Sequence, residues 1–401
     1  MKKIALVNQR YGLEVVGGSE RCTRDIAELL NSHFELEVLT TCALNYDIWE
    51  NYYEQGIHIV NGIKVRRFNV DKQRSKEGFE KVHNNLMFTP KSDPNIDQLE
   101  DNWVDEQGPY SPDLIDYIRK NKDEYDVFIF VTYIYYHTVR ALEIVKDKAI
   151  LIPTAHDEPP IYLNIYKNIF NIPKAIGFLT DEERSFVHSQ FKNEHIPHDV
   201  LGYCINQYQD VPSSLFKEKN QLNDYIAYVG RVDQSKGCDE LCDFFLRYKE
   251  YNPSSLKLVF IGQVVCEIPT HPDIVSLGFV SDEDKISGMA GAQVLVQSSQ
   301  FESLSIVTLE ALAIGTPVIV NGKSEVLRGH CIKSNAGLYY TNYSEFAGTL
   351  NYMLSHNDEY SIMRENGRKY VADNFSADVL VAKITKLINI VAMRGTKDVA
   401  E

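Results

Sequence analysis

The 401-residue sequence contains no run of 18 apolar residues, no C-x-x-C pair and little positive charge. Without a long apolar run the chain has no predicted transmembrane helix. Its 41 basic and 56 acidic residues give a formal net charge of −15, which argues against nonspecific binding to nucleic acid. The same charge argues against a membrane surface as a purely electrostatic partner, although a local basic patch would still allow peripheral membrane contact.

The seven cysteines are odd in number and scattered along the chain, as expected of reduced thiols. A short strand follows Met1-Lys2-Lys3 directly, which is not the pattern of a signal peptide. We therefore expect a cytoplasmic protein. Cys238 and Cys242 stand four residues apart on a predicted helix and could share a metal ion, but two small semi-buried residues are the simpler interpretation.

A chain of this length exceeds one hydrophobic core and predicts two domains. Strands alternate with helices from residue 4 onward, beginning with a strand at 4–7 and a helix at 20–30 that Ser19 is expected to cap. The pattern weakens at 199–224, and a second alternating series starts with a strand at 225–229 and a helix at 238–251. This order predicts an α/β fold of two doubly wound, Rossmann-like domains that face each other across a cleft.

The expected domain limits follow from this pattern. The N-terminal domain covers 1–205, and the C-terminal domain covers 206–375. Residues 71–109 are polar and predict an irregular or helical insertion. A last helix is expected at 376–395, and the cleft is expected to close when a ligand binds.

The most informative stretch places two carboxylates around the start of a helix. An apolar strand at 294–296 is followed by a polar break. Helical spacing then runs from Leu304 to Ile314, with the apolar residues on one side, and Gly315 ends the helix. Ser303, Leu304 and Ser305 would offer backbone N–H groups to an anion at the helix N-terminus. Glu302 is suited to accept hydrogen bonds from sugar hydroxyls, and Glu310 to accept them from a ribose.

A second segment places two cations after a strand. Gly230-Arg231 follows the apolar run 225–229, and Lys236-Gly237 precedes the next helix. Ligands bind at the carboxyl ends of strands in α/β folds, so Arg231 and Lys236 could neutralise a diphosphate.

Two further segments belong to the first domain. Gly17-Gly18 permits close backbone approach before a helix N-terminus, which is a potential anion site. It does not match the G-x-G-x-x-G dinucleotide fingerprint, so a hydride-transfer enzyme is disfavoured. His156-Asp157 follows a strand and could act as a general base, with Asp157 either orienting His156 or binding the acceptor. A Ser-His-Asp hydrolase fits poorly, because no G-x-S-x-G elbow occurs.

The segment around the two glutamates resembles the E-x7-E signature of glycosyltransferase family 4, a family of retaining enzymes with the GT-B fold. Ser305 stands where these enzymes usually have glycine, and the Gly230–Gly237 segment is similar to the family's G-R-x-x-x-x-K-G pattern. The residues that match the signature are Phe301, Glu302, Glu310, Ala311, Ala313, Gly315, Pro317 and Val318.

The resemblance implies that domain 1–205 is the acceptor side, that domain 206–375 binds the nucleotide-sugar donor, and that the last helix, 376–395, packs back on the first domain. It also implies roles for several residues. Gly17 and Gly18 would lie near the donor phosphates and the acceptor, and His156 would contact the transferred sugar near its 6-position. The backbone at Gly278-Phe279 would read the nucleotide base. Glu325 could be the family's cleft-facing glutamate, whereas His330 is expected to be structural.

These observations lead to the hypothesis of a metal-independent, retaining hexosyltransferase without a cofactor. Its donor would be a nucleotide-diphosphate sugar, with UDP expected from family frequency. Its acceptor would be a hydroxyl of a saccharide, a lipid-linked saccharide or a small molecule. The predicted catalytic residues are His156, Asp157, Arg231, Lys236 and Glu302. The alternatives are a UDP-sugar 2-epimerase of the same fold and a non-catalytic sugar-nucleotide-binding domain.

Overall fold

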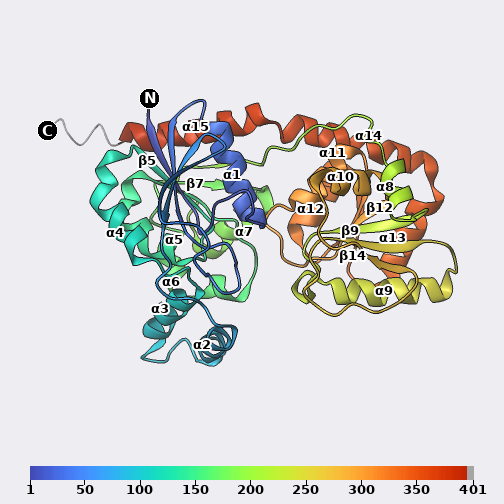
Figure 1. Ribbon diagram of the computed structural model, residues 1–401, viewed down its shortest axis with the longest axis horizontal. Coiled ribbons are helices and arrows are strands. Elements are labelled where there is room, and N and C mark those ends of the chain that lie inside the picture. Colours follow the sequence, from blue (N-terminus) through green and yellow to red (C-terminus); the bar gives the residue numbers. More distant parts are fainter. Residues whose placement is uncertain (395–401) are drawn as a thin grey trace. The chain divides into compact units, whose positions relative to one another are not determined.

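The computed structural model describes residues 1–394 and divides into two compact units (Figure 1). Unit 1 contains Met1–Tyr203 together with the C-terminal helix α15 (Ala377–Arg394). Unit 2 contains Cys204–Ser376. Each unit is built around its own sheet and its own buried apolar cluster. The predicted α/β fold of two doubly wound domains is therefore confirmed.

Unit 1 is built on an eight-stranded sheet in the order β3-β4-β2-β1-β5-β6-β7-β8. All neighbours are parallel except β3 and β4, which form the hairpin that Asn61-Gly62 predicts, with both residues at positive φ. The strands are β1 Lys3–Val7, β2 Glu35–Thr41, β3 Gly56–Val60, β4 Ile63–Phe68, β5 Val127–Val131, β6 Ala149–Ile152, β7 Ala175–Phe178 and β8 His198–Val200. Strand β5 is buried along its whole length, as its unbroken apolar sequence predicts.

Helices flank this sheet, and the red helix α15 runs along it (Figure 1), in contact with β6, β7 and β8. Residues 71–109 contain α2 and α3, which pack against each other. The helices are α1 Gly18–Leu30, α2 Lys76–Phe88, α3 Ile96–Gln107, α4 Pro112–Asn121, α5 Tyr136–Ala141, α6 Ile165–Ile169 and α7 Asp181–Phe191, with 3-10 turns η1 Lys122–Glu124, η2 Leu142–Lys148 and η3 Pro159–Tyr162.

Unit 2 is built on a six-stranded parallel sheet in the order β11-β10-β9-β12-β13-β14. This is the doubly wound 3-2-1-4-5-6 order, in which the winding reverses between β9 and β12. The strands are β9 Tyr225–Val229, β10 Lys257–Ile261, β11 Ile274–Ser276, β12 Val294–Gln297, β13 Val318–Asn321 and β14 Gly337–Tyr340. The helices and turn are α8 Ser214–Lys219, η4 Gln234–Lys236, α9 Cys238–Tyr251, α10 Asp282–Gly291, α11 Ile306–Ile314, α12 Glu325–Ser334, α13 Tyr343–Ser355 and α14 Asn357–Asn374.

Two local predictions about helix starts are wrong. Helix α1 begins at Gly18 with Gly17 as its N-cap, so Ser19 lies inside the first turn, where its hydroxyl donates to Glu20 Oε2 at 2.8 Å. Helix α11 begins at Ile306 rather than Leu304. It is also buried from Thr308 to Ile314 instead of having one apolar side, because α10 and α14 both pack on it.

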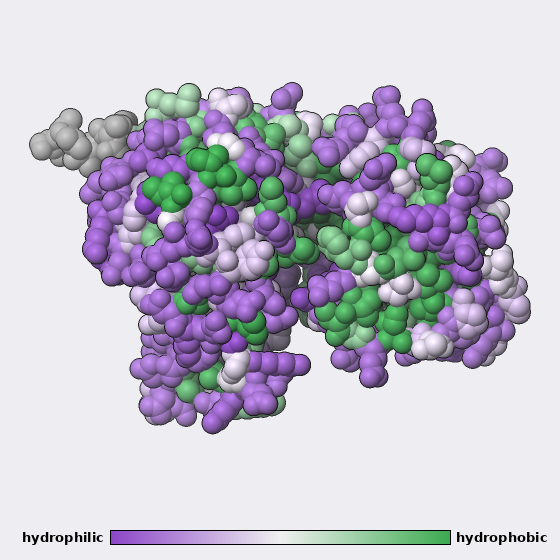
Figure 2. All heavy atoms as spheres, viewed as in Figure 1, coloured by the Kyte–Doolittle hydropathy of each residue, from purple (hydrophilic) through white to green (hydrophobic). Residues whose placement is uncertain are grey.

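Hydrophilic residues cover most of the face seen in the space-filling view, and apolar residues show in smaller areas between them (Figure 2). Within residues 1–394, no helix combines the length and the apolar character that crossing a bilayer requires.

Candidate functional site

Several candidate residues follow the strands at which the winding of each sheet reverses. In unit 2 the loops that follow β9 and β12 leave neighbouring parallel strands at the same edge. In unit 1 the reversal lies between β1 and β5. Doubly wound sheets bind ligands in the crevice beyond the carboxyl ends of such strands. The sheet order brings Lys236 and Glu302 together in unit 2, whereas in unit 1 Gly17 and Gly18 follow β1 and His156 follows β6, the strand beside β5.

The two loops of unit 2 meet in an ion pair. Lys236 Nζ, on the turn after β9, lies 2.8 Å from Glu302 Oε1, on the loop after β12. The lysine side chain is 33% exposed and the glutamate 15% exposed, so the pair is partly shielded yet accessible to a ligand. A cation and a carboxylate at this distance present an anion-binding group and a hydroxyl-binding group side by side.

The backbone around Lys236 is tightly fixed. Gly237 has a φ of 69°, and a Cβ atom there would lie 2.7 Å from the Ser298 carbonyl oxygen, so the approach requires glycine. Ser298 Oγ donates to the Lys236 carbonyl at 2.8 Å, and Asn321 Nδ2 donates to the Ser298 carbonyl at 3.0 Å. These contacts join the ends of β9, β12 and β13 and hold Lys236 without restraining its ammonium group.

Arg231 lies on the same loop and points more to solvent. Its side chain is 45% exposed, and Nη2 is 3.0 Å from Asp233 Oδ2. Asp233 also accepts from the Ser235 N–H at 2.9 Å, which fixes the carboxylate beside the guanidinium. Arg231 and Lys236 thus follow the same strand, as predicted, with the lysine in the more enclosed position.

Ser305 adopts a left-handed backbone conformation, which glycine takes up more easily than other residues. Its φ is 63° and its ψ is 76°, in the left-handed region, and it is the N-cap of α11. Its hydroxyl lies 2.9 Å from Thr308 Oγ1 in the first turn of that helix. Serine at this position therefore keeps the glycine-like backbone path at the cost of local strain.

His330 holds the loop that carries Glu302. The histidine is buried on α12, and its Nε2 donates to the Leu304 carbonyl at 2.8 Å. Its Nδ1 then accepts from the Tyr370 hydroxyl at 3.0 Å, which fixes the tautomer. The expectation of a structural histidine agrees with this geometry, and the anchored loop includes Ser303.

Glu310 is buried one turn into α11, with 2% of its side chain exposed. Its Oε1 lies 3.2 Å from Nζ of Lys285, a residue of α10 that the sequence analysis did not single out. Lys285 also lies 3.1 Å from the exposed Asp282. The role of Glu310 in ribose binding remains a prediction, now with Lys285 as its charge partner.

The remaining predicted residues of unit 2 differ in their setting. Gly278 has a φ of 65° and its carbonyl accepts from the Gly262 N–H at 2.8 Å, while Phe279 is 75% exposed beside it. Glu325 is exposed at the start of α12, where it pairs with Arg328 at 3.2 Å. Base binding by Gly278 and Phe279 and a cleft-facing role for Glu325 stay predictions.

Cys238 and Cys242 are both buried in the core of unit 2, and burial raises the pKa of each thiol. Protonated thiols are poor metal ligands. Residues 1–394 contain no group of three or more histidine, cysteine, aspartate or glutamate side chains placed to hold a metal ion. The two cysteines thus behave as small core residues.

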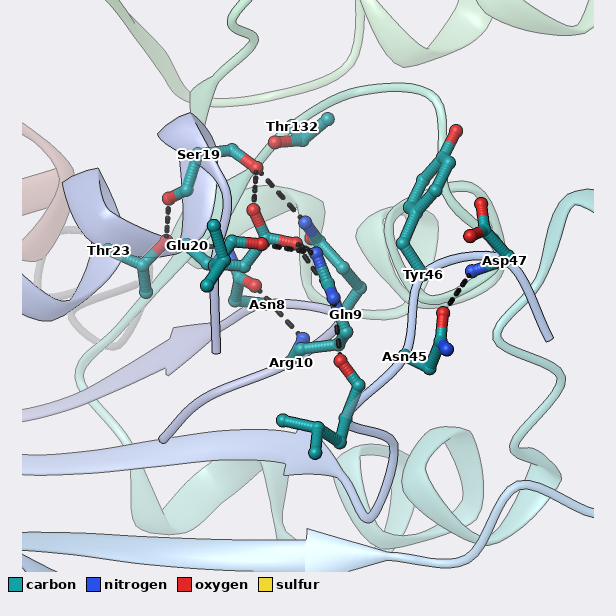
Figure 3. A network of polar contacts seen from close by, with 12 residues as sticks. Asn8, Gln9, Arg10, Ser19, Glu20, Thr23, Asn45, Tyr46, Asp47 and Thr132 are labelled. Carbon is teal, nitrogen blue, oxygen red and sulfur yellow. Dashed lines mark hydrogen bonds and ion pairs between the residues drawn. The ribbon is translucent and has the colours of Figure 1, made fainter. Parts of the chain in front are cut away.

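In unit 1 a polar network surrounds the start of α1 (Figure 3). Arg10 forms a buried ion pair with Glu20, in which Nε donates to Oε1 at 2.9 Å. The Glu20 carboxylate folds back so far that a Cβ atom at Gly17 would collide with it, whereas one at Gly18 would meet nothing within 4 Å. Gly17 is needed for this packing, and Gly18 leaves open space at the helix N-terminus.

His156 lines a polar cavity at the ends of β5 and β6. The cavity has a volume of about 190 Å³ and is lined by Tyr46, Gln107, Thr132, Tyr133, Ile134, Tyr135, Thr154, His156 and Glu158. His156 Nε2 lies 3.7 Å from Glu158 Oε1, and Tyr133 donates its hydroxyl to the same oxygen at 2.8 Å. Asp157 instead accepts from the Tyr162 hydroxyl at 2.6 Å. The structure therefore gives His156 a different carboxylate, Glu158, from the neighbour that the sequence suggested.

Two threonines in this cavity have strained backbones. Thr132 follows β5 directly and Thr154 lies two residues beyond β6, with φ values of 74° and 51°, and their hydroxyls are 3.2 Å apart. A β-branched residue in this region costs about 1–3 kcal/mol. The loop after Thr154 is held by Glu183, whose carboxyl accepts from the Ala155 and Leu179 N–H groups, each at 2.6 Å. Burial raises the pKa of Glu183 to about 8, against the effect of these hydrogen bonds.

Comparison with known proteins agrees with this geometry. Residues 213–370 match the family model described as Glycosyl transferases group 1. The uncharacterized glycosyltransferase MJ1607 of Methanocaldococcus jannaschii is 28% identical over 178 residues, which are 42% of this chain and 45% of that protein. The aligned region thus spans less than half the length of this curated relative.

Two solved structures are similar over nearly the whole chain. Anabaena Alr3699/HepE, in complex with UDP and glucose, is 16% identical with a TM-score of 0.71, and the match covers 97% of this chain and 100% of that one. Sucrose-phosphate synthase from Thermosynechococcus elongatus is 14% identical with a TM-score of 0.69, covering 96% and 98%. The GT-B fold is therefore confirmed, and the match of residues 213–370 to the group 1 glycosyltransferase model agrees with the resemblance of the E-x7-E segment.

Proposed function

We propose that the chain is a retaining, metal-independent hexosyltransferase that moves a sugar from a UDP-sugar to a hydroxyl of a saccharide, a lipid-linked saccharide or a small molecule. The observation that carries the proposal is the Lys236–Glu302 pair at the reversal point of the unit 2 sheet. The family match over residues 213–370 covers this pair, and UDP and glucose are bound by the similar HepE.

The donor would take its place between groups of complementary chemistry. Lys236 and Arg231 would face the diphosphate, together with the first N–H groups of α11, where the helix dipole favours negative charge. Glu302 would accept hydrogen bonds from the sugar hydroxyls, and Glu310 from the ribose. In the absence of donor, Lys236 and Glu302 neutralise each other, so neither charge is left uncompensated.

In the proposed mechanism, most of the rate enhancement comes from stabilisation of the charge on the leaving diphosphate. Negative charge on the diphosphate grows as the sugar bond breaks, and two fixed cations stabilise it without a metal ion. The retaining outcome would follow from same-face attack, in which the leaving diphosphate oxygen helps to deprotonate the acceptor hydroxyl. His156 of unit 1 would contact the transferred sugar, and Asp157 would bind the acceptor. Gly17 and Gly18 would lie near the donor phosphates and the acceptor.

A transfer assay tests this proposal. The full-length protein would be incubated with UDP-sugars and a panel of acceptors in EDTA, and the products analysed by NMR. A glycoside with the anomeric configuration of the donor supports the proposal. An epimerised UDP-sugar would instead indicate a 2-epimerase, and binding without turnover would indicate a regulatory sugar-nucleotide domain. Restoration of a lost activity by magnesium would contradict metal independence.

A further inference from the structure

The cavity of unit 1 contains a carboxylate, Glu158, beside His156, and no lysine or arginine among the described residues that line it. Glu158 is its one acidic group, and 24% of the side chain is exposed. Its Oε1 accepts from Tyr133, but its Oε2 accepts no hydrogen bond from the described residues. A carboxylate oriented through one oxygen can accept a hydrogen bond from a ligand hydroxyl through the other.

Two arginines pack behind the cavity, and neither is available to a ligand inside it. Arg74 lies 4.8 Å from the centre of the Tyr46 ring. It donates from Nε to the Asp47 carbonyl at 3.1 Å, from Nη1 to Gln107 Oε1 at 3.3 Å and from Nη2 to the Tyr46 carbonyl. The guanidinium is therefore used in fixing the wall and does not face the cavity.

The Arg10 guanidinium is also used in contacts within the protein. Its guanidinium binds Glu20 and donates to the Leu44 and Val16 carbonyls at 2.7 and 3.1 Å, and it is almost fully buried (Figure 3). The ion pair cancels its charge. The net charge that the cavity presents to a ligand is therefore that of Glu158, with His156 beside it.

The rest of the lining suits a sugar ring. Tyr46 and Tyr135 place their rings edge to face, with centroids 6.4 Å apart, which offers apolar aromatic surface with polar tips. Thr132 and Thr154 add two hydroxyls at the floor. A volume of about 190 Å³ is below the roughly 300–1,000 Å³ of sites for drug-sized ligands, so the cavity suits a single ring rather than a whole nucleotide sugar.

We infer that this cavity binds an uncharged saccharide unit of the acceptor, and that Glu158 rejects sugars carrying a phosphate. The inference rests on the proposed function, since it assigns the acceptor class of the same enzyme. A phosphate entering here would lose its water, find no lysine or arginine, and approach the Glu158 carboxylate, which already lies beside the His156 ring. Like charges at close range in a partly buried site are strongly unfavourable, so we expect about 100-fold weaker binding.

Ligand-observed NMR on the full-length, UDP-saturated protein tests the inference. The probes are the methyl glycosides of glucose, galactose, mannose and N-acetylglucosamine, each beside its 6-phosphate. At least one neutral member should bind, and its phosphate should bind about 100-fold more weakly. Binding of neither member of any pair, or tighter binding of a phosphate, would overturn the inference.

Variants assign the effect to Glu158. Glu158→Gln keeps the shape and removes the charge, so the preference for the neutral sugar should fall at least 10-fold. Tyr133→Phe, which releases Glu158 Oε1, should weaken the neutral sugar about 3–10-fold. Glu143→Gln, at an exposed glutamate paired with Lys146, is the matched control and should change neither value. An unchanged preference in folded Glu158→Gln would overturn the inference.

The same samples separate this inference from the proposed function. Binding of UDP and UDP-glucose by the wild-type protein is measured first, by calorimetry. If neither binds, the proposed function fails. If UDP-glucose binds and the acceptor preference is for phosphorylated sugars, only the acceptor inference fails.

Discussion

Lys236 Nζ and Glu302 Oε1 are 2.8 Å apart although the two residues follow different strands, β9 and β12. The pair exists because the winding of the sheet reverses between these strands, which brings their loops to one edge. Ser298 supports the contact, because its hydroxyl donates to the Lys236 carbonyl and its own carbonyl accepts from Asn321 Nδ2. One pair thus combines the cation and the carboxylate that a nucleotide sugar requires.

Replacement of Glu302 should separate sugar binding from nucleotide binding. Glu302→Ala should lower kcat/KM for transfer by about 100-fold or more, because a charged hydrogen bond to the sugar is lost and tightens in the transition state. UDP affinity should stay the same or rise, since Lys236 loses its competing carboxylate. Calorimetry with UDP and UDP-glucose measures both. Glu359→Ala, at an exposed position of α14, is the control, and full activity in folded Glu302→Ala would refute the assignment.

Removal of the cations should affect turnover more than binding. Lys236→Ala and Arg231→Ala should each lower kcat by about 10²–10³, because charge on the leaving diphosphate grows in the transition state. Steady-state kinetics in EDTA measure kcat and KM separately. Lys369→Ala, at an exposed lysine that pairs with Asp373 at 2.8 Å, provides the control. A rise in KM alone would show that the cations act only in binding.

Lys236 and Glu302 should also be energetically coupled, because they are in direct contact. The double variant is therefore expected to lose less activity than the product of the two single losses.

Ser305 should tolerate glycine and not valine. Its left-handed backbone suits glycine, so Ser305→Gly should change the free energy of unfolding by less than about 1 kcal/mol, the lost bond to Thr308 offsetting the relieved strain. Ser305→Val should cost about 1–3 kcal/mol and reduce transfer. Chemical denaturation and kinetics check both variants. Equal stability of the two would mean that the backbone at this position relaxes easily.

His137 should make the stability of unit 1 sensitive to acid. It is buried against Tyr135, neither ring nitrogen has a hydrogen-bond partner among the described residues, and burial lowers its pKa to about 3. The unfolded chain takes up a proton near pH 6.5 and the folded chain does not. Stability is therefore full above pH 6.5 and falls by up to about 1.4 kcal/mol per pH unit below it, towards pH 3.

Denaturant titrations at pH 7, 6, 5.5 and 5 measure this slope. His137→Leu should reduce the pH dependence of the free energy of unfolding by the contribution of one bound proton. His195→Leu, at an exposed histidine, should leave it unchanged. A slope that is unchanged in folded His137→Leu would rule out the histidine as its source.

Much of unit 2 could be predicted from the sequence, because its elements are separated by clear local signals. The bounds of β9 and α9 agree with the prediction to the residue, since an apolar block ends at Gly230 and Gly237 precedes the helix. Helices α7 and α12 were not predicted. Both helices are short and largely polar on the outside. Their formation depends on tertiary packing rather than on an apolar periodicity in the sequence.

The site residues show the same division. The positions of Arg231, Lys236 and Glu302 after strand ends could be predicted because each stands in a motif that follows an apolar strand. Lys285 could not, since its contact with Glu310 spans 25 residues and two helices. Neither could the cavity of unit 1, because left-handed φ angles at Thr132 and Thr154 contradict the preference of threonine and arise only from the surrounding fold.

The central claim is that unit 2 holds a nucleotide sugar at the Lys236–Glu302 pair. A crystal structure of the protein with an intact, non-transferable UDP-sugar tests it most directly. The account predicts the diphosphate within hydrogen-bond distance, about 2.7–3.2 Å, of Lys236 Nζ, with a sugar hydroxyl donating to Glu302 and the ribose near Glu310. A nucleotide bound elsewhere, with the Lys236–Glu302 pair intact and uncontacted, would contradict the account.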